Sequence, residues 1–168
     1  MGVSGSGKSS VGRAIANQLN MEFIEADDYH SSSNRARMKA GKPLDDAMRN
    51  PWIDKICKTL QARSAHNQHT VLSCSALRHA HRQRLREAGF RNLFLYLQGD
   101  RELVSRRLKR RRSHFMPAVL LDSQYADFQI PADEADVITI NIARPLDEVI
   151  ESAFAAVSDI TTNSRELS

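Results

Sequence analysis

The chain has few cysteines and no long hydrophobic run. Its two cysteines are Cys57 and Cys74, which excludes a disulfide-stapled scaffold and a cysteine-rich zinc site and favours a reducing compartment, the cytoplasm. Its apolar runs are only a few residues long, whereas a membrane-spanning helix needs roughly 20. The N-terminus also lacks the basic segment followed by an apolar one that marks a secretion signal. We therefore expect a cytoplasmic protein without a transmembrane helix.

The charge imbalance is small, and no linker divides the sequence. Lys and Arg number 24 and Asp and Glu 20, so the net charge is +4. This is too little to establish a nucleic-acid-binding protein, but it suits a protein whose ligands are anions. The chain shows no repeat and no low-complexity segment, and its 168 residues have the length of one ordinary core. We expect a single domain over residues 1–168.

Short apolar segments alternate with amphipathic ones along the chain. The alternation predicts an α/β fold in which helices cover both faces of a parallel sheet. Residues 31–50 contain Gly41 and Pro43 but no strand-like run, so we expect a small helical insertion there. The predicted strands are 22–25, 70–74, 92–97 and 136–141. The predicted helices are 8–19, 51–66, 79–88, 101–112 and 145–157, with Pro51 and Pro145 in first helical turns.

The first residues carry the motif that decides the class. Residues 2–9, GVSGSGKS, match the phosphate-binding loop (P-loop) pattern G-x-x-x-x-G-K-[ST] at every fixed position. In such a loop backbone N–H groups surround an anion, Lys8 reaches the β- and γ-phosphates, and the Ser9 hydroxyl ligates Mg²⁺. A chance turn is disfavoured because an amphipathic helix follows, whose N-terminus attracts phosphate. We predict a three-layer P-loop fold that binds ATP or GTP through Gly2, Val3, Ser4, Gly5, Ser6, Gly7, Lys8, Ser9 and Ser10.

The loop begins unusually early in the chain. A P-loop normally follows a central β-strand, but here Met1 alone precedes it. A buried strand contributes much of the stability of a small domain, since each large apolar side chain gains roughly 1.5 to 3 kcal/mol on burial. We hypothesise that the first central strand is missing, either because the sequence starts downstream of the natural start or because the chain has been truncated.

Acidic residues follow the first predicted strand. No N-K-x-D element for guanine recognition is present, so ATP is the expected nucleotide. Strand 22–25 leads into Asp27 and Asp28, with His30 just after, at the sheet edge where ligands bind in parallel α/β folds. An acid there can hold Mg²⁺ through water and take a proton from an attacking hydroxyl, and Asp27 is the preferred candidate. The alternative is that these acids only cap the next helix.

A basic cluster occupies residues 106–112, where every residue except Leu108 is Lys or Arg. At helical spacing Arg107 and Arg111 fall on the same face as the apolar residues Leu103 and Leu108. We therefore expect this pair to point inward and neutralise phosphate charge, as part of a lid over ATP spanning about residues 101–124. A solvated face and a nucleic-acid patch are the alternatives. The absence of aromatic residues beside the cluster argues against nucleic acid.

Further motifs accompany the P-loop along nearly the whole chain. They are Asp27 with His30, Asn34 with Met38 and Gly41, Pro43-Leu44, Arg49-Asn50-Pro51-Trp52, Cys74-Ser75-Ala76-Leu77-Arg78, Gly99-Asp100, His114-Phe115-Met116, Ser123-Gln124 and Ala132-Asp133-Glu134. In this combination, order and spacing the chain resembles the gluconate kinases, a family of small P-loop sugar-acid kinases. The resemblance implies a fold related to shikimate and nucleoside monophosphate kinases. It also implies ATP-dependent phosphorylation of D-gluconate on its 6-hydroxyl, which yields 6-phosphogluconate.

Gluconate carries one carboxylate and several hydroxyls, so its pocket needs a cation and hydrogen-bonding side chains. Arg49 has a structural alternative, because it can pair with Asp45 or Asp46, and Arg78 can be a surface residue at a helix start. Trp52 is expected in the core. The candidate substrate-binding residues are Asp27, His30, Arg49 and Arg78.

The implied reaction assigns roles to several of these residues. Lys8, Asp27, Arg107 and Arg111 form the expected catalytic set, with ATP as co-substrate and Mg²⁺ held by Ser9 and Asp27. We expect D-gluconate as the small-molecule partner, with neither nucleic acid nor membrane, and a homodimer is an alternative to a monomer. The rival functions are a related kinase acting on shikimate or a nucleoside monophosphate, and a non-catalytic nucleic-acid-binding module.

Overall fold

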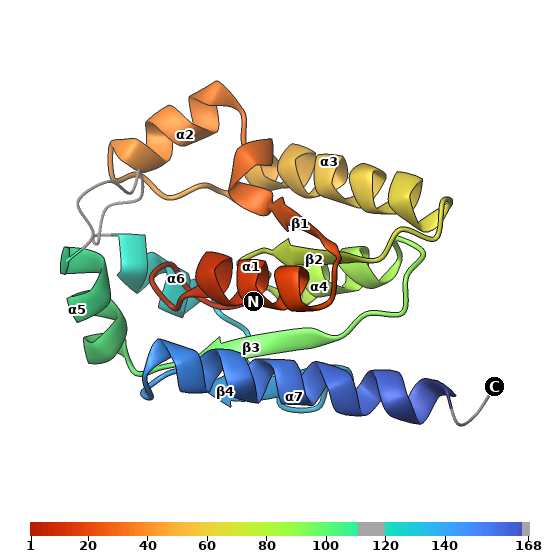
Figure 1. Cartoon of the computed structure of the whole chain (residues 1–168). Helices are drawn as coiled ribbons and strands as arrows, with labels where there is room; N and C mark the ends of the chain where they lie inside the picture. The colour runs from red at the N-terminus through yellow and green to blue at the C-terminus, as the bar shows by residue number, and fades with distance from the viewer. Residues whose placement is uncertain (111–119, 166–168) are drawn as a thin grey trace.

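The computed structural model describes residues 1–110 and 120–165, which form parallel strands flanked by helices (Figure 1). The strands pair as two parallel pairs, β1 with β2 and β3 with β4. Each lies where the sequence predicts a strand, with small shifts at the ends. The strands are β1 (Glu22–Glu25), β2 (Thr70–Ser73), β3 (Phe94–Gln98) and β4 (Val137–Asn141).

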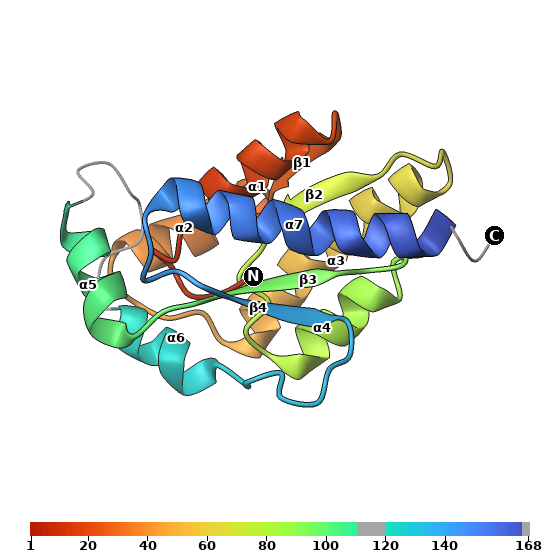
Figure 2. The ribbon, with the colours of Figure 1, turned by 60° about the horizontal axis from the view of Figure 1, so that its bottom comes forward.

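The backbone of the first two residues lies between the two strand pairs. Leu97 of β3 donates its backbone N–H to the Met1 carbonyl (3.0 Å), and Gly2 donates to the carbonyl of Ser75, just beyond β2 (3.1 Å). The N-terminal amine donates to the Leu95 carbonyl, and burial lowers the pKa of this amine to about 5. Met1 and Gly2 thus occupy the place that the sequence analysis assigns to a central strand, in the middle of the molecule (Figure 2).

The helices confirm the alternation of strands and helices. Residues 31–50 contain a helix and the start of a second one, as expected for a helical insertion. The helices are α1 (Lys8–Gln18), the short 3₁₀ helix η1 (Ala26–Tyr29), α2 (Ser32–Lys39), α3 (Asp46–Ser64), α4 (His79–Arg86), α5 (Arg101–Arg110), α6 (Leu121–Asp127) and α7 (Leu146–Arg165).

The start of α3 differs from the prediction. The helix begins at Asp46 rather than at Pro51, because the Asp45 side chain caps it by accepting the Met48 backbone N–H (2.8 Å). Pro51 therefore lies inside the helix, where it lacks the N–H that would bond to the preceding turn. The cap places Arg49 within the first turns of α3, so its position is set by a helix rather than by a loop.

Two apolar clusters cover opposite faces of the strands. Neighbouring residues of β3 illustrate this, since Phe94 belongs to one cluster and Leu95 packs against the other, as expected when successive side chains of a strand alternate between faces. One cluster includes Ile15 of α1 and Ala153 of α7, and the other includes Ile56 of α3. The result is the expected three-layer arrangement, with α1 beside α7.

One end of the molecule gathers the elements that the sequence analysis connects with function. All four strands point toward this end, where α2, α5, α6 and the start of α1 lie (Figure 1). Of the helices that the structure describes, none combines the length and apolar character needed to cross a membrane.

Candidate active site

The P-loop has the backbone geometry of an anion-binding loop. Gly5 and Gly7 adopt φ angles of 86° and 99°, in the left-handed region that favours glycine. A Cβ on Gly5 would lie 2.8 Å from Leu108 Cγ, so the loop also needs glycine to approach α5 this closely. The Ser6 hydroxyl is buried and has no hydrogen-bond partner among the described residues. The two glycines therefore give the loop the backbone conformation that the motif predicts.

A pocket opens between the P-loop and the ends of β1 and β2. It brings together most of the side chains that the sequence analysis selected, although they come from four different segments of the chain. The Lys8 ammonium donates to the Val3 carbonyl across the loop (3.0 Å). The pocket is lined by Ser4, Gly5, Gly7, Lys8, Ser9, Glu25, Asp27, His30, Met38, Pro43, Leu44, Arg49, Trp52, Ser75, Leu77, Arg78, His81, Leu120, Ser123 and Gln124.

The remaining predicted loop residues do not line the pocket. Gly2, Val3 and Ser6 are buried, and Ser10 is exposed on the first turn of α1. The loop surface that faces the pocket is therefore formed by Ser4 to Ser9 without Ser6.

Asp27 and Asp28 lie in different surroundings in the structure. Asp27 lines the pocket, whereas Asp28 is exposed and does not. The cap of the next helix, α2, is Ser31, whose hydroxyl accepts the Asn34 backbone N–H (3.1 Å). Neither acid performs the capping role that was the alternative for them.

His30 lies against the wall of the pocket formed by Trp52. The two rings stack with centroids 4.5 Å apart and an interplanar angle of 11°. Burial, reinforced by the nearby Arg35 and Arg49, lowers the pKa of His30 to about 4, so the ring is neutral at pH 7. Its Nδ1 is buried with no partner in the part of the chain that the structure describes. A neutral, unpartnered imidazole suits hydrogen bonding to a ligand hydroxyl.

Trp52 belongs to the core as expected, but it also shapes the pocket. It is 4% exposed, and its indole N–H donates to the Ala26 carbonyl (2.7 Å). This bond anchors η1 directly beside Asp27. His81 meets Trp52 edge-on, with centroids 6.4 Å apart. Burial, followed by the nearby charge of Arg49, lowers the pKa of His81.

Arg49 and Arg78 form a closed ring of ion pairs with two aspartates. Asp127 at the end of α6 accepts from Arg49 Nη2 (2.5 Å) and Arg78 Nη2 (2.6 Å), one oxygen for each. Asp46 accepts from Arg78 Nη1 (2.6 Å) and lies 3.7 Å from Arg49 Nη1. The Arg49–Asp46 pairing considered in the sequence analysis is thus present, but Asp127 is the nearer partner. We call these four residues the arginine ring.

Hydrogen bonds within the arginine ring shift the pKa values of Asp127 and Arg78. Burial alone would raise the pKa of Asp127, but hydrogen bonds from Arg78 and Arg49 outweigh it and lower that pKa below its ordinary value. The Asp127 hydrogen bond is the main reason that the pKa of Arg78 is raised. Asp127 and Arg78 therefore stay charged at neutral pH, next to a pocket.

Arg107 faces inward on α5 but does not line the pocket. It is half-buried, between the buried Val104 and Leu108, whereas Lys109 on the other face is exposed. Its Nη2 donates to the Ile142 carbonyl (2.8 Å), at the end of β4. The predicted helical phase is confirmed, while a phosphate contact of Arg107 stays a prediction. Arg111 lies outside the described residues.

Helix α6 contributes Ser123 and Gln124, at the end of the predicted lid segment, and Asp127, which the sequence analysis did not select. Gln124 accepts the backbone N–H of Ser4 in the P-loop (2.7 Å), and Ser123 lines the pocket. Asp127 joins the arginine ring from the same helix. These contacts link residues far apart in sequence, so no local sequence pattern predicts them.

A parallel α/β fold with a P-loop at the start of its first helix, and with an acid and two arginines in the adjoining pocket, defines a P-loop kinase. A sequence model of the shikimate kinase family matches residues 4–156. The thermoresistant gluconokinase of Escherichia coli is 38% identical over 158 residues, covering 94% of this chain and 90% of that protein. The chain therefore belongs to the gluconokinase family of P-loop kinases.

Solved structures agree with this assignment. A gluconokinase from Sinorhizobium meliloti superposes with a TM-score of 0.89 at 38% identity, covering 100% of this chain and 94% of that one. An APS kinase from Mycobacterium tuberculosis superposes with a TM-score of 0.60 at 18% identity, covering 94% of each chain. The second likeness concerns the fold alone.

Proposed function

We propose that this protein uses ATP to phosphorylate D-gluconate on its 6-hydroxyl, which yields 6-phospho-D-gluconate. The observation that carries the proposal is one pocket lined both by the P-loop and by Asp27, Arg49 and Arg78. Such a pocket can hold a nucleotide phosphate chain and an anionic polyol side by side. Relatives named gluconokinase, at 38% identity for the Escherichia coli protein, support this choice of acceptor.

The P-loop residues are assigned to the nucleotide. Backbone N–H groups of the loop and the N-terminus of α1 surround the phosphates. Lys8 exchanges its bond with the Val3 carbonyl for contacts with the β- and γ-phosphates.

Ser9 and Asp27 are assigned to Mg²⁺. Both line the pocket, and together they offer a hydroxyl and a carboxylate, the oxygen ligands that Mg²⁺ prefers. No group of three or more His, Cys, Asp or Glu residues suited to a metal occurs within residues 1–110 and 120–165. This fits an ion that takes its other ligands from phosphates and water. With the ion held by Ser9 and Asp27, phosphate charge would be neutralised during the transfer.

The acceptor side combines orientation with proton transfer. Arg49 and Arg78 bind the gluconate carboxylate, and the neutral His30 ring hydrogen-bonds a hydroxyl of the sugar acid. Asp27 orients the 6-hydroxyl and takes its proton late, as a loose phosphoryl-transfer transition state requires. Lys8, Arg107 and Arg111 stabilise the charge on the transferring group. Closure of the lid, residues 101–124, excludes water and limits ATP hydrolysis.

The remaining expectations concern the setting of the enzyme. A cytoplasmic location suits an enzyme that consumes ATP and a free sugar acid, and neither nucleic acid nor membrane is needed for the reaction. A homodimer is the alternative to a monomer, and light scattering distinguishes the two.

An acceptor panel tests the proposal. ADP release is measured with gluconate, shikimate and a nucleoside monophosphate as acceptors, and we expect turnover to be fastest with gluconate. Lys8→Ala and Asp27→Ala should each abolish that turnover, since they remove the phosphate contact and the proton acceptor. Faster turnover with shikimate or a nucleotide would replace gluconate as the acceptor, and near-normal activity of Asp27→Ala would remove the assigned role of Asp27.

A further inference from the structure

The arginine ring contains two residues that stand outside the pocket, Asp46 and Asp127, and of these Asp127 is the less exposed and the one that bonds to both arginines. Arg49 and Arg78 both line the pocket, whereas Asp127 does not, although it bonds to both arginines. Its carboxylate therefore binds both guanidinium groups without lining the space that a ligand would use. Each guanidinium has five N–H donors, and within the described chain the ring occupies only part of them.

The position of Asp127 is fixed through the rest of α6. Gln124, one turn earlier, accepts the Ser4 N–H of the P-loop (2.7 Å). Tyr125 donates its hydroxyl to the Gly99 carbonyl after β3 (3.1 Å). The helix is thus fastened to the loop that faces the nucleotide phosphates and to the end of a central strand. Because Asp127 is held in place, its hydrogen bonds in turn fix the positions of Arg49 and Arg78.

We propose that Asp127 is a positioning residue that aims Arg49 and Arg78 at the carboxylate of the sugar-acid acceptor. The inference rests on the proposed function, because it assumes an anionic acceptor in this pocket. Long arginine side chains lose considerable conformational freedom on binding a ligand, and a carboxylate that already holds both guanidinium groups removes much of this loss before the acceptor arrives. Asp127 also orders the two arginines relative to the P-loop, so the acceptor lies in register with the phosphate to be transferred.

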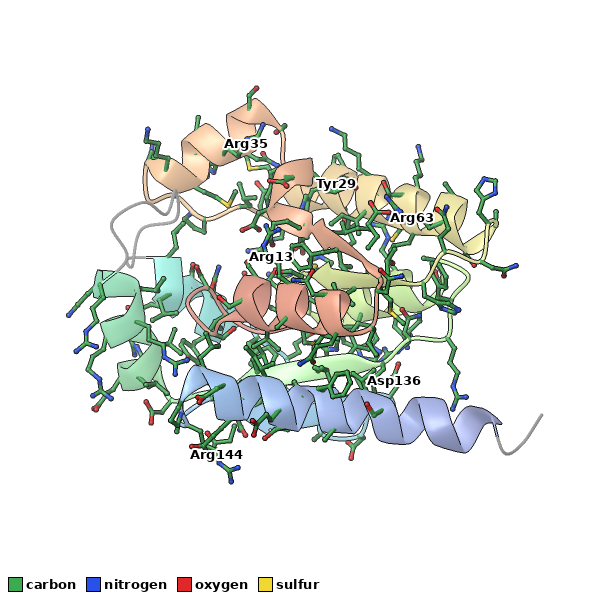
Figure 3. The ribbon with its side chains drawn as sticks, viewed as in Figure 1. Arg13, Tyr29, Arg35, Arg63, Asp136 and Arg144 are labelled. Atoms are coloured by element: carbon green, nitrogen blue, oxygen red, sulfur yellow. The ribbon has the colours of Figure 1, made fainter. Side chains whose placement is uncertain are left out.

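The test compares Asp127→Asn with a matched control. The substitution keeps the shape and one acceptor oxygen but removes the charge that pairs with two arginines. Asp136→Asn is the control, since Asp136 is also half-buried and also accepts two bonds from an arginine, Arg86 (2.8 and 2.6 Å). Asp136 is not in the pocket lining, and Figure 3 shows it far from the insertion that carries Arg35.

We expect Asp127→Asn to raise the KM for gluconate about tenfold, the size of effect typical of losing a charge-assisted hydrogen bond. The KM for ATP and kcat should stay within about twofold of the original values, because the P-loop and Asp27 are untouched. Asp127→Glu keeps the charge one methylene group further out and should restore most of the loss. Asp136→Asn should leave all three kinetic constants unchanged, although it too removes a carboxylate charge that pairs with an arginine.

Three results would overturn the inference. An unchanged KM for gluconate means that the arginines do not need Asp127, and a lower KM means that Asp127 competes with the acceptor. An equal change in the KM for ATP, in kcat and in the KM for gluconate means a general structural role. Failure of the proposed function is recognised separately, because the unmodified protein would then show no turnover with gluconate at all.

Discussion

Two networks of arginines and carboxylates in this molecule use the same chemistry for different ends. The first is the arginine ring beside the pocket. The second, which we call the buried cluster after its central pair of Arg82 and Glu134, also includes the partly exposed Arg86 and Asp136. Arg82 is 1% exposed and donates to both Glu134 oxygens and to the carbonyls of Ala76, Leu77 and Gln129. Its donors are directed into the protein, whereas the arginine ring borders an open pocket.

The electrostatics of the two networks follow the same division. The hydrogen bond from Arg82 is the largest cause that lowers the pKa of Glu134 to about 2. In the arginine ring the side chains of Arg78 and Asp127 are 32% and 22% exposed. Solvent therefore weakens the ion pair between them. In the second network the pair of Arg82 and Glu134, whose side chains are 1% and 11% exposed, fixes the segment before β4 against α4. A partly open network keeps charge available for a ligand.

The largest effect is expected from breaking the buried cluster. Arg82→Ala leaves the Glu134 charge without its buried partner and empties a tightly packed site. We expect the free energy of unfolding to fall by about 3–5 kcal/mol, the usual result of removing one partner of a buried ion pair. Urea unfolding measures the loss. A decrease below about 1 kcal/mol would show that the buried cluster behaves like a surface ion pair and would erase the contrast with the arginine ring.

The second-largest effect is expected from acid, which should weaken the buried cluster. The pKa of Glu134 is lowered from 4.5 to about 2, so its contribution to stability is complete above about pH 4.5 and is lost as the pH falls toward about 2. A shift of this size corresponds to about 3 kcal/mol. Thermal melts between pH 6 and pH 2 should show this loss in the original protein and a smaller one in Glu134→Gln. Equal slopes for the two proteins would contradict the assignment.

Breaking the arginine ring should affect binding more than stability. Arg78→Gln removes one of the two cations assigned to the gluconate carboxylate, so we expect the KM for gluconate to rise about 10- to 100-fold. Its unfolding free energy should fall by only about 1 kcal/mol, because the ring is partly exposed. Steady-state kinetics and a urea titration of the same variant measure the two quantities. A loss of stability like that of Arg82→Ala would place the ring with the structural networks.

The smallest effect is expected from the exposed face of α5. Lys109 is exposed, and its removal in Lys109→Ala should change both kcat/KM and the unfolding free energy by less than about 0.5 kcal/mol. The same assays check this. A large loss of activity would mean that the basic cluster acts as a whole, rather than through Arg107 on its inner face.

Local signals predicted much of this structure. The P-loop was predicted because its functional residues are consecutive, so a single sequence motif includes its glycines and Lys8. The strands and most helix positions follow from short apolar runs and periodicity. Asp27 and His30 were found because they follow a strand directly, at the edge where parallel strands end.

Long-range contacts were not readable in the same way. Asp127 is 78 residues from Arg49 and 49 from Arg78 in sequence, and Gln124 is 120 residues from Ser4. Only the folded chain brings these groups together. The start of α3 was missed for a different reason, since the Asp45 cap outweighed the preference of Pro51 for a first turn.

The most direct test of the central claim is to identify the product. Phosphorus NMR of the protein with ATP, Mg²⁺ and gluconate should show ADP together with an equal amount of a phosphate monoester, its signal split by the methylene protons of carbon 6. ADP accompanied only by inorganic phosphate, or no consumption of ATP, would contradict the account.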